Sequence, residues 1–283
     1  MIGGTIGTPS TVRLNSAEFQ RIRDFILEAC GINLSPPKRV LVESRLQRRL
    51  AQLQISSFTG YCDYVMTPTG MREELVHMID ALTTNKTDFF REPVHFRFLQ
   101  EEVLPAWQHS STSRPFRVWS AACSSGEEPY TLAMLLSDWE QDYPFQFRIT
   151  ATDISTRVLE KAVLGIYPER SIADVPMPLR RKYLLRSKDK DNPTVRLVPS
   201  LRSRVLFKRL NLMDKLLDVE SDFDAIFCRN VLIYFDRHTQ MQVLNKLCQK
   251  LRSGGYLFIG HSESVHDMQL PLRQIQPTIF QRR

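Results

Sequence analysis

The clearest chemistry in this 283-residue chain lies at one strand-to-helix turn and at the end of the next strand. The loop 121–128 (AACSSGEE) follows a predicted strand and opens a helix. Its small side chains let a ligand approach the backbone, and a helix start offers unpaired N–H groups. Asp153 ends the next predicted strand, where a carboxylate can accept hydrogen bonds from ribose hydroxyls. Together they predict a nucleoside pocket.

Each feature also has a structural interpretation. The loop 121–128 lacks the G-x-G-x-x-G pattern, so it is equally an ordinary tight turn whose acidic residues match the helix dipole. Asp153 is equally a cap for the helix 154–164. Only their occurrence on neighbouring strands favours the ligand.

Two further polar segments could line the same pocket. Residues 83–92 (TTNKTDFFRE) join the two halves of the chain, and an interdomain linker is the simpler interpretation. Residues 229–235 (RNVLIYF) directly follow a buried strand, where ligand-binding residues gather. The alternative is an ordinary connection with Tyr234 packed at its rim.

Other candidate sites fail on spacing. The segment 260–264 (GHSES) ends in serine where a nucleophile elbow has glycine. The six histidines show no metal-ligand spacing, and His261 and His266 are five residues apart. We therefore expect no metal.

The first part of the chain has a helical pattern. Asn15 and Glu18 form a predicted capping box, and Gly31 ends that helix. A second helix begins near Pro36, with a predicted apolar stripe of Val40, Leu41, Leu46, Leu50 and Leu53. Helical stretches at 57–66 and 70–82 follow. We predict a disordered tail at 1–14 and an all-helical domain at 15–85.

Residues 86–283 alternate short apolar runs with amphipathic helices, which predicts a doubly wound α/β domain. The predicted strands are 116–120, 145–152, 205–210, 222–229 and 255–260, and the helices are 127–140, 155–164 and 239–251. An insert at about 168–205 interrupts this order. Its candidate strands, 182–185 and 194–198, predict a β-hairpin.

Composition limits the class of protein. No apolar run approaches the roughly 20 residues that span a bilayer, and no signal peptide is visible. Five cysteines without a CxxC pair predict reduced thiols and a cytoplasmic location. The net charge of +7 suggests an acidic partner. It is concentrated in 170–209, which carry +9, and on the second helix, where Arg45, Arg48 and Arg49 share a face.

Four segments together resemble the CheR family of chemotaxis receptor methyltransferases, in the family's order and from about residue 15 to the end. They are TTNKTDFFRE, VWSAACSSGEEPYTLA, FDAIFCRNVLIYFD and FIGHSES. The resemblance implies a helical N-terminal domain and a Rossmann-like S-adenosylmethionine-dependent methyltransferase domain with a small antiparallel β-subdomain. It implies cofactor contacts by Asn85, Thr87, Arg91, Glu128, Asp153, Asn211, Leu212, Arg229 and Asn230. Whether Glu127 or Glu128 points inward stays open.

The implied reaction is methylation of glutamate side chains in the cytoplasmic helical bundle of chemoreceptors, with Arg91 and Tyr234 at the catalytic centre. Docking on the acidic bundle is expected from Lys38, Arg39, Arg45, Arg48 and Arg49. The loop 187–193 lacks glycine, which puts a receptor-tethering role of the insert in doubt. We expect a monomer that neither binds nucleic acid nor inserts into a membrane. A nucleic-acid methyltransferase and a non-catalytic adaptor are the alternatives.

Overall fold

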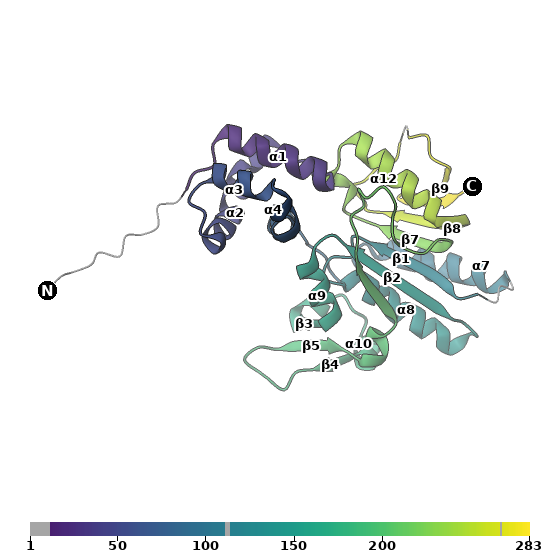
Figure 1. The fold of residues 1–283 in the computed structure, drawn as a ribbon. Helices are drawn as coiled ribbons and strands as arrows, with labels where there is room; N and C mark the ends of the chain where they lie inside the picture. The colour runs from purple at the N-terminus through teal and green to yellow at the C-terminus, as the bar shows by residue number, and fades with distance from the viewer. Residues whose placement is uncertain (1–11, 111–113, 267) are drawn as a thin grey trace. The chain divides into compact units, whose positions relative to one another are not determined.

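The computed structural model describes residues 12–110, 114–266 and 268–283. The chain divides into two compact units, one ending at Thr83 and the other spanning Thr84–Arg283. Each unit is described by itself (Figure 1). Within the described residues, no helix is both long and apolar enough to cross a bilayer.

The N-terminal unit is built of short helices. They are α1 (Ser16–Cys30), the 3-10 turn η1 (Pro36–Lys38), α2 (Arg39–Leu53), α3 (Phe58–Val65), α4 (Pro68–Glu73) and α5 (Leu75–Leu82). The capping box predicted for α1 is present, since Asn15 and Glu18 bond each other's backbone N–H. Gly31 ends α1 at φ 75°, a left-handed conformation that favours glycine.

The apolar stripe predicted for α2 is wrong at its beginning. Val42, Leu46 and Leu50 are buried, whereas Val40 is 70% exposed and Leu41 43% exposed. Steps of four residues keep a stripe on one helix face, and the six-residue step from Val40 to Leu46 does not.

The predicted disordered tail is corrected at its end. Leu14 is buried, and its N–H donates to Glu43 Oε2 at 2.7 Å. Gln47 Nε2 donates to the Val12 carbonyl at 3.0 Å. These bonds attach 12–14 to α2, while the rest of the predicted tail, 1–11, lies outside the described residues.

Two arginines expected on a docking face of α2 hold the helical unit together. Arg49 donates to both carboxylate oxygens of Glu74, at 2.9 and 2.6 Å, and Glu74 is buried. Arg45 donates to the carbonyls of Leu82 and Thr83 at the end of α5. Arg39 and Arg48 are exposed, so they keep the character expected of a docking surface.

The second unit is built on a seven-stranded sheet in the order β6-β2-β1-β7-β8-β10-β9. Strands β1, β2, β6, β7 and β8 are parallel, and β10 and β9 add an antiparallel edge. Their bounds are β1 (Phe116–Ala121), β2 (Phe147–Asp153), β6 (Val205–Arg209), β7 (Phe223–Cys228), β8 (Leu251–Ile259), β9 (Leu272–Gln276) and β10 (Ile279–Arg282). The predicted doubly wound α/β fold is confirmed. The edge strands β9 and β10 were not predicted.

Helices cover both faces of this sheet. Adjacent strand residues enter different cores: Val118 joins the larger apolar cluster and Trp119 the smaller one. The larger cluster includes residues of α6 (Pro93–Phe98), the π-helix η2 (Leu99–Val103), α7 (Leu104–His109) and α8 (Glu127–Asp142). The smaller includes residues of α12 (Arg237–Lys250) and of the 3-10 turn η4 (Leu232–Tyr234). Helix α9 (Thr156–Leu164) follows β2.

The insert forms a separate three-stranded antiparallel sheet, β3-β5-β4, rather than a simple hairpin (Figure 1). Its elements are β3 (Ile166–Pro168), η3 (Glu169–Ile172), α10 (Met177–Tyr183), β4 (Leu184–Arg186), β5 (Thr194–Leu197) and α11 (Pro199–Arg202). The strand predicted at 182–185 is wrong at Lys182 and Tyr183, which end α10. Pro178, in the first turn of α10, favours a helix start there.

Candidate functional site

Five parallel strands end at one edge of the sheet, and the loops that follow them build the site. Strands β1 and β7 are neighbours, with β2 beyond β1 and β8 beyond β7. From β1 the chain continues outward through β2 to β6, and then crosses to β7 on the other side of β1. Open α/β sheets bind ligands at the point where the strand order switches in this way.

The loop after β1 is shaped for a close backbone approach. Ala122 and Ser124 adopt φ values of 59° and 51°, in the left-handed region that non-glycine residues seldom visit. Gly126 has φ 97°, and a Cβ there would lie 2.8 Å from the Cβ of Ala162. Residues with strained backbone conformations cluster at functional sites, and they persist only where contacts with the surrounding structure fix them.

Asp153 ties this loop to the end of β2. Its Oδ2 accepts the Ser124 N–H at 2.8 Å, and its Oδ1 accepts the Ser155 N–H at 3.0 Å. The cap of α9 is Ser155, whose side chain accepts from the Val158 N–H. The interpretation of Asp153 as the helix cap is therefore wrong, although the carboxylate is buried where the pocket was predicted.

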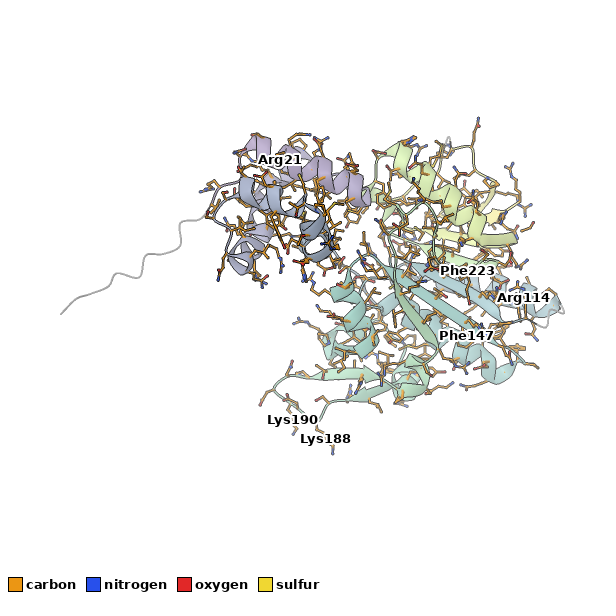
Figure 2. The ribbon with its side chains drawn as sticks, in the orientation of Figure 1. Arg21, Arg114, Phe147, Lys188, Lys190 and Phe223 are labelled. Atoms are coloured by element: carbon orange, nitrogen blue, oxygen red, sulfur yellow. The ribbon has the colours of Figure 1, made fainter. Side chains whose placement is uncertain are left out.

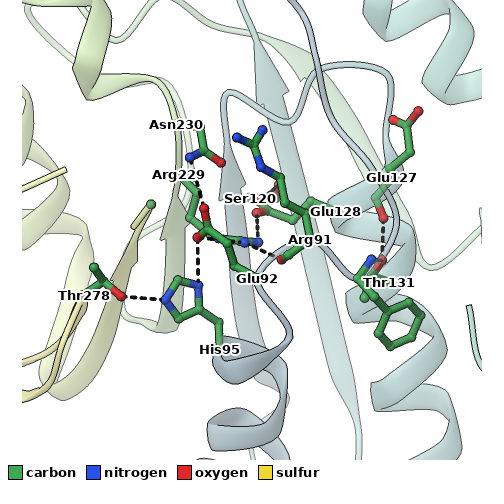
Figure 3. Close-up of polar contacts among 12 residues, drawn as sticks. Arg91, Glu92, His95, Ser120, Glu127, Glu128, Thr131, Arg229, Asn230 and Thr278 are labelled. Carbon is green, nitrogen blue, oxygen red and sulfur yellow. Dashed lines mark hydrogen bonds and ion pairs between the residues drawn. The ribbon is translucent and has the colours of Figure 1, made fainter. Parts of the chain in front are cut away.

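A buried charge cluster lies between β1 and β7 (Figure 3). The Arg229 side chain is 3% exposed, with Nη1 2.9 Å from Glu128 Oε2 and Nη2 3.1 Å from Glu92 Oε2. Arg229 also donates to the Arg91 carbonyl. Glu128 accepts a second bond from Ser120 Oγ at 2.6 Å. One cation shared by two carboxylates leaves a net negative charge at the sheet edge.

The two adjacent glutamates of α8 have different surroundings. Glu128 bonds to Arg229, whereas Glu127 accepts a hydrogen bond from Ser125 Oγ at 2.8 Å. Burial raises the pKa of Glu127 to about 7 despite that hydrogen bond. The tertiary structure thus distinguishes two residues that the sequence left equivalent.

Glu92 and His95 are site residues that the sequence analysis missed. Burial alone would raise the pKa of Glu92, but Arg229, Asn230 and the His261 N–H outweigh it and lower that pKa. His95 is fully buried, and desolvation together with Arg229 lowers its pKa to about 3. The sequence signal was slight, since Glu92 only ends the polar segment 83–92.

Glu263 shapes the loop after β7 and was also missed. Its carboxylate accepts the N–H groups of Gly260, Asn230 and Leu232, at 2.6, 3.0 and 2.7 Å. Gly260 must be glycine, because a Cβ there would lie 2.4 Å from Asn230 Nδ2. Asn230 itself sits at φ 58°. The segment GHSES therefore positions a neighbouring loop, and its glycine followed by a glutamate was the available signal.

The polar segment between the two units packs along the same edge. Ser124 Oγ donates to the Asn85 carbonyl at 3.1 Å, and Tyr234 Oη lies 3.5 Å from the Thr84 carbonyl. Arg91 Nη1 donates to the Lys86 carbonyl at 3.1 Å. The structure thus brings Asn85, Arg91 and Tyr234 to the edge that holds Asp153, and Thr87 lies half-buried in the same segment.

Asn211 and Leu212 follow β6 beside Asp153. The Leu210 N–H donates to the Asp153 carbonyl at 3.0 Å, which fixes the chain just before them. Asn211 Oδ1 accepts the Met213 N–H at 3.0 Å, and Leu212 is buried. They lie on the β6 side of the sheet edge at which Asp153 ends β2.

Both units match one protein family. Residues 85–280 match the model described as CheR methyltransferase, SAM binding domain, and residues 17–83 match CheR methyltransferase, all-alpha domain.

Curated relatives match nearly the whole chain. The chemotaxis protein methyltransferase of Borreliella burgdorferi is 40% identical over 276 residues, which cover 96% of each protein. Chemotaxis protein methyltransferase 2 of Pseudomonas aeruginosa is 39% identical and covers 93% of this chain and 92% of its own. The Escherichia coli chemotaxis protein methyltransferase is 39% identical, over 90% of this chain and 87% of its own length.

The surroundings of Glu127 predict a pH-dependent cost in stability. The unfolded glutamate ionises near pH 4.5, whereas the folded one holds its proton to about pH 7. Folding is therefore favoured most below pH 4.5, and that contribution is lost progressively as the pH rises from 4.5 through about 7. We expect Glu127→Gln to exceed wild type in free energy of unfolding by about 3 kcal/mol at pH 8, and to equal it at pH 4.

Urea unfolding at both pH values measures this difference. Glu160→Gln, at an exposed position of α9, is the matched control and should show no pH-dependent difference. An equal effect of Glu127→Gln at pH 4 and pH 8 would show that the carboxylate is already well solvated.

Proposed function

The chain belongs to the CheR methyltransferase family, and we propose that it transfers a methyl group from S-adenosylmethionine to glutamate side chains of chemoreceptor cytoplasmic domains. The products are glutamate methyl esters, which serve sensory adaptation, and S-adenosylhomocysteine. The observation that carries the proposal is the pair of buried groups at this sheet edge: the Arg229 cluster after β7 and Asp153 at the end of β2, on opposite sides of β1.

The residues at this edge fit the cofactor. The Asp153 carboxylate is a suitable acceptor for ribose hydroxyls. The net negative charge of the Arg229 cluster suits a ligand with a cationic sulfur and an ammonium group. Gly126 allows the turn to pack closely against Ala162 and Tyr167, where a Cβ would clash. When bound, S-adenosylmethionine supplies a methyl group on a positively charged sulfur.

The remaining assignments follow the strand ends. Glu128 and Arg229 hold the amino-acid part of the cofactor, with Arg91 near its methionine end. Asn211 and Leu212 border the adenine, because they continue β6 next to Asp153. Asn85, Thr87 and Asn230 complete the wall from the two loops that meet at this edge.

The substrate end consists of Arg91 and Tyr234. A glutamate with a pKa of about 4.3 is already ionised at neutral pH, so the chain needs no general base. The Arg91 guanidinium and the Tyr234 hydroxyl are the groups that hold and orient this carboxylate. Attack of the glutamate carboxylate on the sulfonium methyl group neutralises two opposite charges, and water opposes this step because it solvates the separated charges. The surrounding residues must therefore align the carboxylate with the methyl group and exclude water.

Receptor docking is assigned to the exposed basic part of α2. Arg39 and Arg48 are exposed, and Lys38 precedes the helix. Arg45 and Arg49 belong to the same basic sequence, but their side chains bond within the helical unit. The docking surface is therefore narrower than the sequence suggested.

Methyl transfer from labelled cofactor to receptor cytoplasmic fragments tests the function directly. We expect base-labile label on receptor glutamates and none on RNA or DNA offered in parallel. Label on nucleic acid would support the alternative substrate class. Cofactor binding without any transfer would support a non-catalytic adaptor.

Replacing the Asp153 carboxylate tests the cofactor site. Asp153→Ala should weaken S-adenosylhomocysteine binding by about 1–3 kcal/mol, because hydrogen bonds to a charged group are lost. Calorimetry measures the affinity. Ser155→Ala is the matched control: it removes the cap of α9, at a cost of about 1 kcal/mol in stability, and should leave the affinity unchanged. If folded Asp153→Ala bound S-adenosylhomocysteine as tightly as wild type, Asp153 would not be a cofactor-binding residue.

Reversing the exposed charges of α2 tests the docking surface. Arg39→Glu combined with Arg48→Glu should raise KM for receptor about threefold or more at 0.1 M salt, and less at 1 M, where charges are screened within about 3 Å. Melting temperature and cofactor affinity should not change.

The basic insert supplies the comparison for that double variant. Lys188 and Lys190 project from the loop between β4 and β5 (Figure 2), and both are exposed. Lys188→Glu combined with Lys190→Glu should leave KM unchanged. The reverse result, with KM raised only by the insert variant, would make the insert the docking surface.

A further inference from the structure

Three potential metal ligands from distant parts of the chain meet beside the Arg229 cluster. They are Glu92 and His95 at the start of α6, and His261 after β8. One ligand atom of each lies within 4.8 Å of the other two. Glu92 Oε2 is 3.6 Å from His95 Nδ1 and 3.9 Å from His261 Nε2. Sequence spacing gave no sign of this group, because 166 residues separate the two histidines.

The hydrogen bonds of Thr278 orient the ring of His95. Thr278 Oγ1 donates to the Pro277 carbonyl at 2.6 Å, so it accepts from His95 Nε2 at 2.8 Å. Nε2 therefore carries a proton for Thr278, and Nδ1 is the ring nitrogen left for another partner. Figure 3 shows the contact between His95 and Thr278. An oxygen acceptor on the far nitrogen of a histidine is the usual arrangement at metal sites.

The other ring nitrogen of His95 faces a carboxylate. Nδ1 is buried without a hydrogen-bond partner, and it points toward the Glu92 carboxylate. A buried ring nitrogen and a carboxylate that face each other without a hydrogen bond need a donor or a cation between them.

We infer that Glu92, His95 and His261 form a binding site for a divalent transition-metal ion of the zinc class. Two imidazoles and one carboxylate are a ligand set that zinc accepts, with a fourth position left for water. Zinc bonds of about 2.0–2.2 Å are compatible with ligand atoms 3.6 and 3.9 Å apart. The exposed ring of His261 is the side chain that must rotate to complete the site.

Arg229 is the charge that opposes an ion here. Its Nη2 lies 3.1 Å from the same Glu92 oxygen. However, Arg229 is also paired with Glu128, so the three side chains carry two negative charges and one positive charge. The remaining negative charge favours a cation. A bound ion would hold Glu92, and through Glu92 the side chains of Arg229 and Asn230.

Zinc binding to the chelator-treated full chain tests this site without any activity measurement. Calorimetry with zinc chloride should show one ion per chain, and the melting temperature should rise with zinc. Cobalt(II) should give the strong visible absorption of a low-coordinate site with nitrogen ligands. A wild-type chain that binds no zinc, as when a water molecule bridges Glu92 and His95, would refute the proposal.

Variants separate this site from other zinc-binding groups. His261→Ala removes an exposed ligand and should weaken zinc binding at least about tenfold. His238→Ala is the matched control, an exposed histidine of α12 bonded to Gln242, and should bind like wild type. Thr278→Val removes the acceptor of His95 and should weaken binding about 10- to 100-fold. Wild-type affinity in both His261→Ala and Thr278→Val would overturn the assignment.

Discussion

The site depends on one buried cation. The Arg229 guanidinium bonds to the Glu128 carboxylate of α8, and to the Glu92 carboxylate and the Arg91 carbonyl just before α6. It therefore connects its own loop after β7 to two other segments of the sheet edge. A buried charge of this kind is costly to leave unpaired, because water cannot replace a missing partner. The positions of Glu92 and Glu128 are therefore fixed together with that of Arg229. The excess of one negative charge is what the cluster offers to a cationic ligand, whether a sulfonium cofactor or a metal ion.

Backbone constraints shape the loops around this cation. Phe90, Glu92, Ala122, Ser124 and Asn230 all adopt positive φ, and all lie in the loops that surround the cluster. Carboxylates hold two of these turns: Asp153 accepts from Ser124, and Glu263 accepts from Asn230. Acidic side chains thus serve as structural acceptors for backbone N–H groups as well as charges for ligands. Because these carboxylates are buried in shared hydrogen-bond networks, we expect the substitution of one of them to disturb neighbouring groups that it does not contact directly.

The basic residues of α2 likewise include some with structural contacts and some on the surface. On α2, Arg45 and Arg49 bond to the carbonyls at the end of α5 and to the buried Glu74, while Arg39 and Arg48 remain exposed. A row of arginines in a sequence therefore combines structural and surface residues. Only burial of the partner separates them, since an arginine beside a buried carboxylate cannot be removed without exposing an unpaired charge to the interior.

The sequence by itself determined the fold class, the capping of α1, and the strand ends at which Asp153, Arg229 and Asn230 lie, because hydrophobic period and strand-to-helix order are local properties. It did not give the phase of α2 at Val40, the helix that ends at Tyr183, or the edge strands β9 and β10, which depend on what each segment packs against. It also left Glu127 and Glu128 equivalent. Only the tertiary structure separated them, and only it brought Glu92, His95 and His261 together, because the packing of α6 and the loop after β8 joins residues that no sequence spacing relates.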